Sequence, residues 1–275
     1  MNPERIAAIS RPCIGVFDSG VGGLSVLRAL RRAMPAAPLV YYADSAFAPY
    51  GERDAAYVDA RCRAIASTLV ERGAKALLIA CNTATAAAIE GLRDAWPGLP
   101  IIGVEPGVKP AVALSRSRRV AVMATQRTLQ SERFRRLVER YAAECEVIAH
   151  PCPGLAAAIE AGDVEAPSMR GRVRELCEPL RGRGVDVIVL GCTHYPFVRH
   201  HIEAAMAGAA AIVDTAEAVA RQTAARCEGS SWSGPATTRL MGSGDLDLLG
   251  RLATRWLEFD WTIESQPAAD PISRW

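Results

Sequence analysis

The sequence predicts an α/β fold with two similar domains, each containing a largely parallel sheet flanked by helices. Short apolar runs of strand length alternate with helix-length amphipathic segments, which is typical of parallel sheets covered on both faces. Two of these runs, one in each half of the chain, end in the same pattern of small residue, cysteine and polar residues. No apolar run reaches the ~18 residues of a membrane-spanning helix.

Each predicted element follows from this alternation. We predict strands at 13–18, 39–43, 76–81, 101–105, 119–124, 146–149, 186–191 and 211–214. We predict helices at 22–33, 54–72, 83–95, 127–142, 168–183, 196–206, 215–227 and 244–257.

The two similar segments are ALLIACNTAT, which contains Cys81, and VIVLGCTHYP, which contains Cys192. A Pro- and Gly-rich stretch at 103–112 is the predicted crossing between the two halves, with a return near 211–218. We therefore predict a discontinuous first domain, residues 1–106 and 213–275, and a second domain, residues 107–212. Because ligands of open α/β sheets bind beyond the carboxyl ends of the strands, we expect both thiols to flank one cleft between the domains.

The charge balance argues against a polyanionic partner. The chain has 32 Lys+Arg and 30 Asp+Glu, so its formal net charge is +2. We therefore expect no binding to nucleic acid or to a membrane surface. The first residues, MNPERIAAISRPC, break off before the apolar core of a signal peptide, and we expect a cytoplasmic protein.

The eight cysteines predict free thiols. No CxxC pair occurs, and Cys192 and His194 supply two ligands where a zinc site needs three or four. We expect no metal and no cofactor.

We predict that Cys81 and Cys192 are the reactive side chains. A thiol at a strand end, where the chain enters a helix, lies near the helix N-terminus, which favours the thiolate. The alternative is a pair of buried packing cysteines, because free Cys behaves as a small hydrophobe. The matching contexts CNT and CTH favour the chemical interpretation.

Further polar residues follow the predicted strands. DSGVGG begins at Asp18 and can bring a backbone turn close to an anion, although Asp18 could instead be an ordinary helix cap. Tyr50 lies in a PYG turn that can present backbone N–H groups, although from these three residues alone a plain surface turn is the favoured interpretation. His194 could relay the proton of Cys192, or be a structural histidine. For Glu160, an exposed helix position is the default.

The ordered motifs DSGVGG, PYG, ACNTAT, GVEPG, CPGLAAAIEAG and LGCTHYPF resemble the glutamate racemases of the aspartate/glutamate racemase superfamily. The resemblance covers residues from about 13 to about 218. It implies two similar α/β domains with substrate between them and one acid/base cysteine from each, Cys81 and Cys192. It further implies that the amino acid is bound by Asp18, Ser19, Tyr50, Gly51, Asn82, Thr83, Thr193 and His194. It implies that Asp18, Glu160 and His194 assist the nearer thiol.

By the same resemblance we expect cofactor-independent interconversion of L- and D-glutamate, a supply of D-glutamate for bacterial peptidoglycan, and a homodimer. The sequence departs from the family pattern at Ala43, where Gly is usual, and at DTAEA (214–218), where an Asp-Ser start is usual. Beyond about residue 219 the match assigns no residues.

Other functions stay open at this point. A related racemase or decarboxylase could act on aspartate, a hydantoin or a malonate, although a decarboxylase needs only one thiol. A two-domain amino-acid-binding protein would use the same cleft, but it gives no reason for paired thiols. The missing CxxC motif argues against a thiol-disulfide oxidoreductase.

Overall fold

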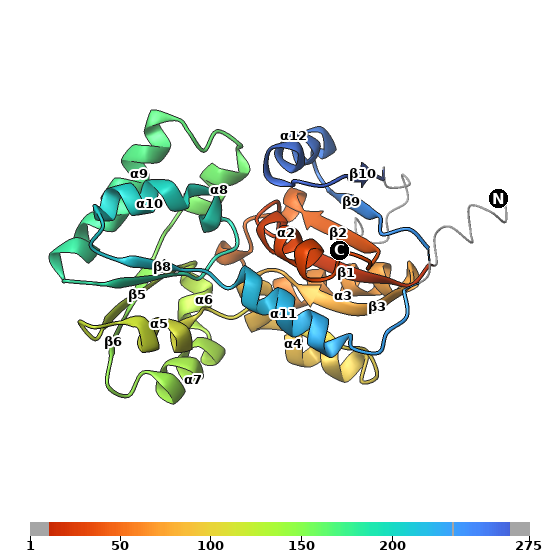
Figure 1. Ribbon diagram of the computed structural model, residues 1–275, viewed down its shortest axis with the longest axis horizontal. Coiled ribbons are helices and arrows are strands. Elements are labelled where there is room, and N and C mark those ends of the chain that lie inside the picture. The colour runs from red at the N-terminus through yellow and green to blue at the C-terminus, as the bar shows by residue number, and fades with distance from the viewer. Residues whose placement is uncertain (1–10, 233, 265–275) are drawn as a thin grey trace. The chain divides into compact units, whose positions relative to one another are not determined.

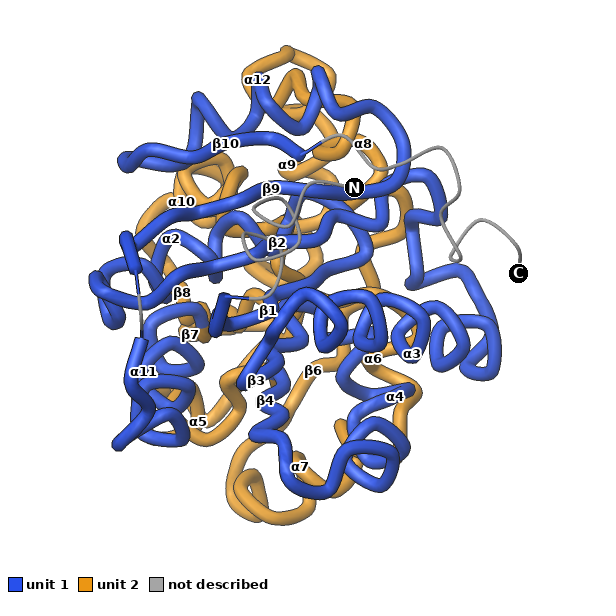
Figure 2. Tube along the Cα trace, turned by 90° about the vertical axis from the view of Figure 1, so that its right-hand side faces the viewer, with its two compact units in different colours: residues 1–104, 216–275 blue, residues 105–215 orange. Residues whose placement is uncertain are grey.

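The computed structural model describes residues 11–232 and 234–264, and the chain divides into two compact units (Figures 1 and 2). Unit 1 comprises residues 1–104 and 216–275, and unit 2 comprises residues 105–215. Each unit has its own parallel sheet. The predicted first domain also includes residues 1–10 and 265–275, which lie outside the described residues.

Unit 1 contains a six-stranded sheet in the order β10-β9-β2-β1-β3-β4, with every pairing parallel. Its strands are β1 (Cys13–Asp18), β2 (Leu39–Asp44), β3 (Ala74–Ile79), β4 (Ile101–Gly103), β9 (Thr238–Ser243) and β10 (Thr262–Ile263). All residues of β1 and β2 are buried, which explains why these strands are continuous apolar runs instead of alternating ones.

The helices in the described part of unit 1 are α2 (Leu24–Ala33), α3 (Ala55–Glu71), α4 (Asn82–Ala95), α11 (Ala216–Arg226) and α12 (Leu246–Trp256). Two short 3₁₀ helices, η1 (Ser45–Phe47) and η2 (Tyr50–Glu52), connect β2 to α3. The chain crosses from β1 to β2 on one side and then from β2 past β1 to β3 on the other. Because such crossovers are right-handed, α2 and α3 cover opposite faces of the sheet (Figure 1).

Unit 2 repeats this topology with four parallel strands in the order β6-β5-β7-β8. The strands are β5 (Arg119–Ala124), β6 (Glu146–Pro151), β7 (Val187–Leu190) and β8 (Ala211–Val213). The helices are α5 (Val108–Leu114), α6 (Gln126–Gln130), α7 (Glu132–Tyr141), α8 (Leu155–Glu160), α9 (Pro167–Gly182), η3 (Tyr195–Val198) and α10 (Arg199–Met206). In both units the first strand of the repeat lies between the second and the third.

Several predicted elements differ in detail. The helix predicted at 127–142 is two helices, because Ser131 leaves the helical conformation and its Oγ caps α7 by accepting the Phe134 N–H at 3.1 Å. The stretch predicted as a plain crossing contains α5, in which Pro110 stands in the first turn, where its missing N–H costs no helical bond. Strands β9 and β10 are not predicted, because the β9 sequence TRLMGS is no continuous apolar run and β10 has only two residues.

No helix among the described residues is long and apolar enough to cross a membrane. Each unit has its own apolar core. The core of unit 1 includes Tyr42, Tyr50, Cys62 and Cys81. The core of unit 2 is formed around Val120, Val122 and Val189.

Gly242 allows β9 to approach β2 closely, since a Cβ at this position would lie 2.3 Å from the Ala43 carbonyl oxygen. We predict that Gly242→Ala lowers the free energy of unfolding by about 1–3 kcal/mol or more, because backbone atoms have to move. Chemical denaturation would measure the change. Gly98→Ala is the matched control, since a Cβ at Gly98 would meet nothing within 4 Å. Equal stability of the two variants would contradict this account of the β2–β9 pairing.

Candidate active site

In unit 1, three predicted site residues meet where the crossovers change direction. Asp18 ends β1, Ser19 follows it, and Cys81 follows the adjacent strand β3. The backbone N–H of Ala80 donates to the Phe17 carbonyl at 2.7 Å, which keeps the two strand ends together beyond the sheet. In open α/β sheets this reversal point leaves a crevice at the carboxyl ends of the strands.

The Cys81 thiol has two kinds of partner. Its Sγ accepts the Ala84 N–H at 3.4 Å and caps α4, so the thiol lies at a helix N-terminus, as predicted. Sγ also lies 3.7 Å from Ser19 Oγ, and the Ser19 hydroxyl donates to Asp18 Oδ1 at 3.1 Å. Asp18 is fully buried. Thiol, hydroxyl and carboxylate therefore form a chain along which a proton can be shared.

Asp18 is not a helix cap. Helix α2 begins after Gly23, and the Asp18 carboxylate instead accepts the Ser19 N–H at 2.6 Å. The simpler interpretation of Asp18 as an ordinary cap is therefore wrong.

Asn82 and Thr83 form the first turn of α4, directly after Cys81, and both are buried. The Asn82 Oδ1 atom is buried without a hydrogen-bond partner. A buried acceptor of this kind costs free energy unless a donor reaches it. Asn82 therefore offers an acceptor to a ligand that binds beside Cys81.

Tyr50 and Gly51 lie in η2, which packs against α4. The Tyr50 side chain is buried and its hydroxyl donates to Asp44 Oδ2 at 2.5 Å. Burial, together with the negative charge of Asp44, raises the pKa of Tyr50 well above its usual value, so the hydroxyl keeps its proton. Because the Tyr50 hydroxyl is hydrogen-bonded to Asp44, a ligand at this position would contact the backbone of Tyr50 and Gly51 instead.

In unit 2, the corresponding strand end carries Cys192, Thr193 and His194, all buried. Cys192 Sγ lies 3.6 Å from His194 Nδ1, and His194 Nε2 lies 2.5 Å from Glu160 Oε1. Glu160 ends α8, and its side chain is 14% exposed, so the default of an exposed glutamate is wrong here. Thiol, imidazole and carboxylate form a second proton-sharing chain.

The two thiols differ in their relation to a helix. Cys81 is itself the cap of α4, whereas in unit 2 the cap of η3 is His194, and Cys192 lies two residues earlier. The prediction that each thiol lies at a helix N-terminus is therefore correct only for Cys81. Beside Cys192 the positive charge comes from an imidazole.

His194 is well suited to carry that charge. Burial opposes the imidazolium, but the contacts with Cys192 and Glu160 outweigh it and raise the pKa of His194 well above its usual value. The protonated ring can stabilise a Cys192 thiolate or donate a proton.

Two other thiols lie near the candidate site but remain protonated. Cys62 is completely buried, and burial together with the charge of Cys81 raises its pKa well above its usual value. Burial and the charge of Cys192 likewise raise the pKa of Cys152. Because Cys62 and Cys152 stay protonated near neutral pH, neither supplies a thiolate that could accept a proton.

One group of described residues has the composition of a metal site. Ligand atoms of Glu165, His200 and His201 lie within 4.8 Å of one another. His201 Nε2 lies 2.9 Å from the Val164 carbonyl oxygen, which can only accept, so this nitrogen carries a proton and offers no lone pair. Glu165 and His200 are exposed, and the group contains no predicted site residue. His200 Nε2 lies 3.3 Å from Glu165 Oε2, so the group is held by hydrogen bonds near the surface.

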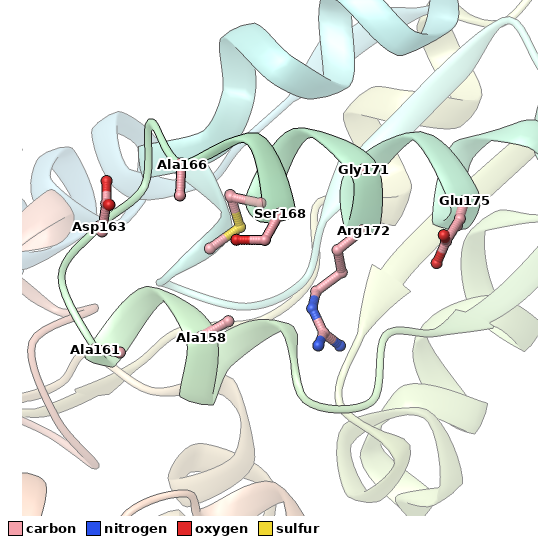
Figure 3. A pocket seen from close by; sticks show the side chains of 9 residues that line it. Ala158, Ala161, Asp163, Ala166, Ser168, Gly171, Arg172 and Glu175 are labelled. Atoms are coloured by element: carbon pink, nitrogen blue, oxygen red, sulfur yellow. The ribbon is translucent and has the colours of Figure 1, made fainter.

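A pocket of about 600 Å³ lies between α8 and α9 in unit 2 (Figure 3). Its wall includes Ala158 and Ala161 from the α8 region and Arg172 and Glu175 from α9. None of the predicted site residues lines this pocket. It is therefore separate from the Cys192 chain, although Glu160 belongs to the same short helix.

The repeated α/β topology, with one thiol in contact with a polar side chain at the reversal point of each sheet, defines a class of α/β proteins built from two similar units. Comparison with known proteins makes this more specific. The profile of the Asp/Glu/Hydantoin racemase family matches residues 14–223, and the chain belongs to this family.

The chain is similar in sequence to glutamate racemases of several bacteria. The chain is 48% identical over 241 residues to the glutamate racemase of Stutzerimonas stutzeri, a match covering 87% of this chain and 91% of that protein. It is 51% identical over 217 residues to the glutamate racemase of Pseudomonas paraeruginosa, covering 79% and 82%. The crystal structure of Escherichia coli glutamate racemase with L-glutamate and the activator UDP-MurNAc-ala matches with a TM-score of 0.82 and 30% identity, covering 92% and 97%. These comparisons confirm the predicted fold class and the resemblance.

The Glu160–His194 contact leads to a prediction about pH. We expect Glu160→Gln to lower the pKa of His194, because the imidazolium loses its carboxylate partner while burial still opposes the charge. A raised folded-state pKa contributes stability that is complete below the unfolded-state pKa and lost as the pH rises through the folded-state value. In the variant this loss should therefore occur at lower pH.

Nitrogen-15 NMR of the imidazole rings across a pH titration would measure this pKa. Glu165→Gln is the matched control, since its carboxylate faces His200 at 3.3 Å and not His194. An unchanged His194 titration in Glu160→Gln would contradict the role assigned to Glu160.

Proposed function

We propose that this chain is an isomerase that interconverts L-glutamate and D-glutamate without a cofactor, using Cys81 and Cys192 as its two acid/base groups. The proposal rests on two rows of contacting side chains, each at the reversal point of its own sheet. One row is Cys81–Ser19–Asp18 and the other is Cys192–His194–Glu160. The relatives at about 50% identity, which are glutamate racemases, support glutamate as the substrate.

Inversion of an α-carbon explains why two thiols are needed. One base removes the α-proton from one face, and one acid delivers a proton to the opposite face. A thiol can do either near neutral pH if one cysteine starts as thiolate and the other as thiol. In the reverse direction the two exchange roles. Each unit supplies one of these groups, and we propose that the two units are the functional domains.

The surrounding polar residues suit an amino acid. The buried Asn82 Oδ1 matches the α-ammonium group, which is a donor. The side chains of Ser19, Thr83, Thr193 and His194, and the backbone of Tyr50 and Gly51, are the proposed partners of the remaining polar atoms, with Asp18 behind Ser19. Donors aimed at the carboxylate stabilise the developing carbanion, and one such bond can be worth about 2.7–4 kcal/mol.

The lysines support a mechanism without pyridoxal. The chain has two, and Lys75 is an exposed residue near the start of β3, at the opposite end of the strand from Cys81. Lys109 lies in α5 with its Nζ 5.5 Å from the Tyr141 ring centroid. Neither position suits a Schiff base beside the thiols.

The family resemblance also supports three broader proposals. The chain forms a homodimer, it acts in the cytoplasm, and its D-glutamate enters peptidoglycan synthesis. Light scattering during gel filtration would test the dimer. Restoration of growth in a bacterial strain that requires D-glutamate would test the supply role.

Replacing either catalytic thiol should abolish most activity. We predict that Cys81→Ala and Cys192→Ala each lower kcat by about 10²–10⁴-fold, the range of one lost acid/base group, while circular dichroism shows an intact fold. Polarimetry with L-glutamate, D-glutamate, L-aspartate and a hydantoin would measure activity and substrate choice. Cys145→Ala is the control, since this half-buried thiol belongs to neither of the two rows of contacting side chains. Near-normal turnover by Cys192→Ala in both directions would overturn the proposed mechanism.

Isotope content tests whether two groups act on opposite faces. With L-glutamate in deuterated water, early D-product should carry deuterium at the α-carbon, because the delivering thiol has exchanged with solvent, and remaining L-substrate should stay largely protiated. Mass spectrometry of both separated enantiomers at low conversion would measure this. Retention of the original proton in early D-product would instead mean that a single base carries it across.

A further inference from the structure

We propose that Asp44 and Arg61 are positioning residues, whose buried ion pair holds the Tyr50–Gly51 segment in its substrate-binding position beside Cys81. The proposal rests on the proposed function, in which the backbone of Tyr50 and Gly51 meets the amino acid. Neither residue was assigned a role by the sequence motifs.

The Asp44 carboxylate is a hub of four hydrogen bonds. It accepts from Arg61 Nε at 3.0 Å and Nη2 at 2.7 Å, from the Tyr50 hydroxyl at 2.5 Å and from the Ser243 hydroxyl at 2.8 Å. The donors belong to three different elements, α3, η2 and β9. One carboxylate at the end of β2 therefore joins three segments, of which β9 lies 199 residues away in the sequence.

The hub is deeply buried. Asp44 is 0% exposed and Arg61 is 2% exposed. The Phe47 ring lies over the guanidinium, 3.6 Å from Arg61 Cζ to the ring centroid. A buried charge is tolerated only when it is paired and hydrogen-bonded, so this carboxylate strongly favours the one arrangement in which all its donors are present.

The hub acts on the loop that bears the proposed substrate contacts. Asp44 ends β2, so the connection through η1 and η2 starts at the hub and is held by it again at Tyr50. Ser243 adds a second tie, since its Oγ also accepts the Ala46 N–H at 3.2 Å. Because η2 packs against α4, which begins directly after Cys81, the hub sets where the Tyr50 and Gly51 backbone lies relative to the thiol.

Ser243 extends the active-site support beyond the family match. The matched region ends at residue 223, whereas Ser243 ends β9 and is paired in register with Asp44 on β2. The C-terminal segment thus contributes a strand and a hydroxyl to the loop that faces the substrate.

The test uses variants that remove one donor and leave the ion pair. Asp44→Asn or Arg61→Met would strand a buried charge and lower stability, so loss of folding would obscure their effect on the loop. Tyr50→Phe removes only the hydroxyl, and Ser243→Ala removes the tie from β9. Tyr57→Phe is the matched control, because Tyr57 lies at the start of α3, outside the hub, with its ring facing Arg53. Ser243→Thr restores a hydroxyl.

We expect Tyr50→Phe and Ser243→Ala each to raise KM for both enantiomers by about 3- to 10-fold, with kcat changed less than KM, since one hydrogen bond is lost and the reacting thiols are untouched. Ser243→Thr should recover most of the KM of the natural protein, and Tyr57→Phe should leave KM unchanged. Steady-state kinetics in both directions, with thermal unfolding of each variant, gives these values.

A lower melting temperature with unchanged KM in both donor variants would overturn the proposal, because the hub would then be merely structural. Equal KM values for Ser243→Ala and Ser243→Thr, both above that of the natural protein, would overturn the role of the hydroxyl. The proposed function fails separately, if the natural protein does not racemise glutamate. KM would then be compared on whichever amino acid it does racemise.

Discussion

The reversal of crossover direction at the first strand of each repeat is the constraint on which the site depends. In each unit the second strand adds on one side of the first and the third strand adds on the other. The connections therefore leave on opposite faces, which is the arrangement that leaves a crevice at the carboxyl ends of the central strands of open sheets. Residues that follow these strands stand at the sheet edge where ligands of such sheets bind, while their backbones are held by the buried strands β1 and β7 and by β3. This explains how a thiol can be both rigidly held and able to reach a ligand.

The same position is supported by different chemistry in the two units. Cys81 relies on a backbone N–H at a helix N-terminus and on a hydroxyl backed by Asp18. Cys192 relies on an imidazole oriented by Glu160. Cys81 thus lies beside an aligned peptide dipole and a hydroxyl, whereas Cys192 lies beside a ring that carries a full positive charge when it is protonated. The repeated fold thus preserves the placement of the thiol without preserving the residues around it.

The sequence predicts the parts of the site that follow from local pattern. Buried parallel strands appear as apolar runs, so the positions of Asp18, Ser19, Cys81 and Cys192 after such runs could be recognised. The motif resemblance brought in Glu160, which local pattern alone would have left on an exposed helix face.

What could not be predicted depends on contacts between distant residues. The Asp44–Ser243 bond joins positions 199 apart, and it requires β9, whose sequence TRLMGS has no strong apolar pattern. The direction of the Tyr50 side chain was equally hidden, because a PYG turn does not reveal which neighbour takes the hydroxyl. Cys81 caps α4, whereas η3 is capped by His194, two residues after Cys192. This difference depends on the local backbone conformation after each strand, which the two similar motifs do not reveal.

The unlike supports of the two thiols have a consequence for the energetics of the proposed reaction. Mirror-image amino acids have equal free energy in solution, so the equilibrium constant is one, and kcat/KM must be the same in both directions. The difference between a Ser–Asp support and a His–Glu support therefore cannot favour either enantiomer in that ratio. It can appear only as a matched change in kcat and KM, through the energy of the bound state in which the proton resides on one thiol instead of the other. Two thiols with different supports must therefore give the same kcat/KM for both enantiomers.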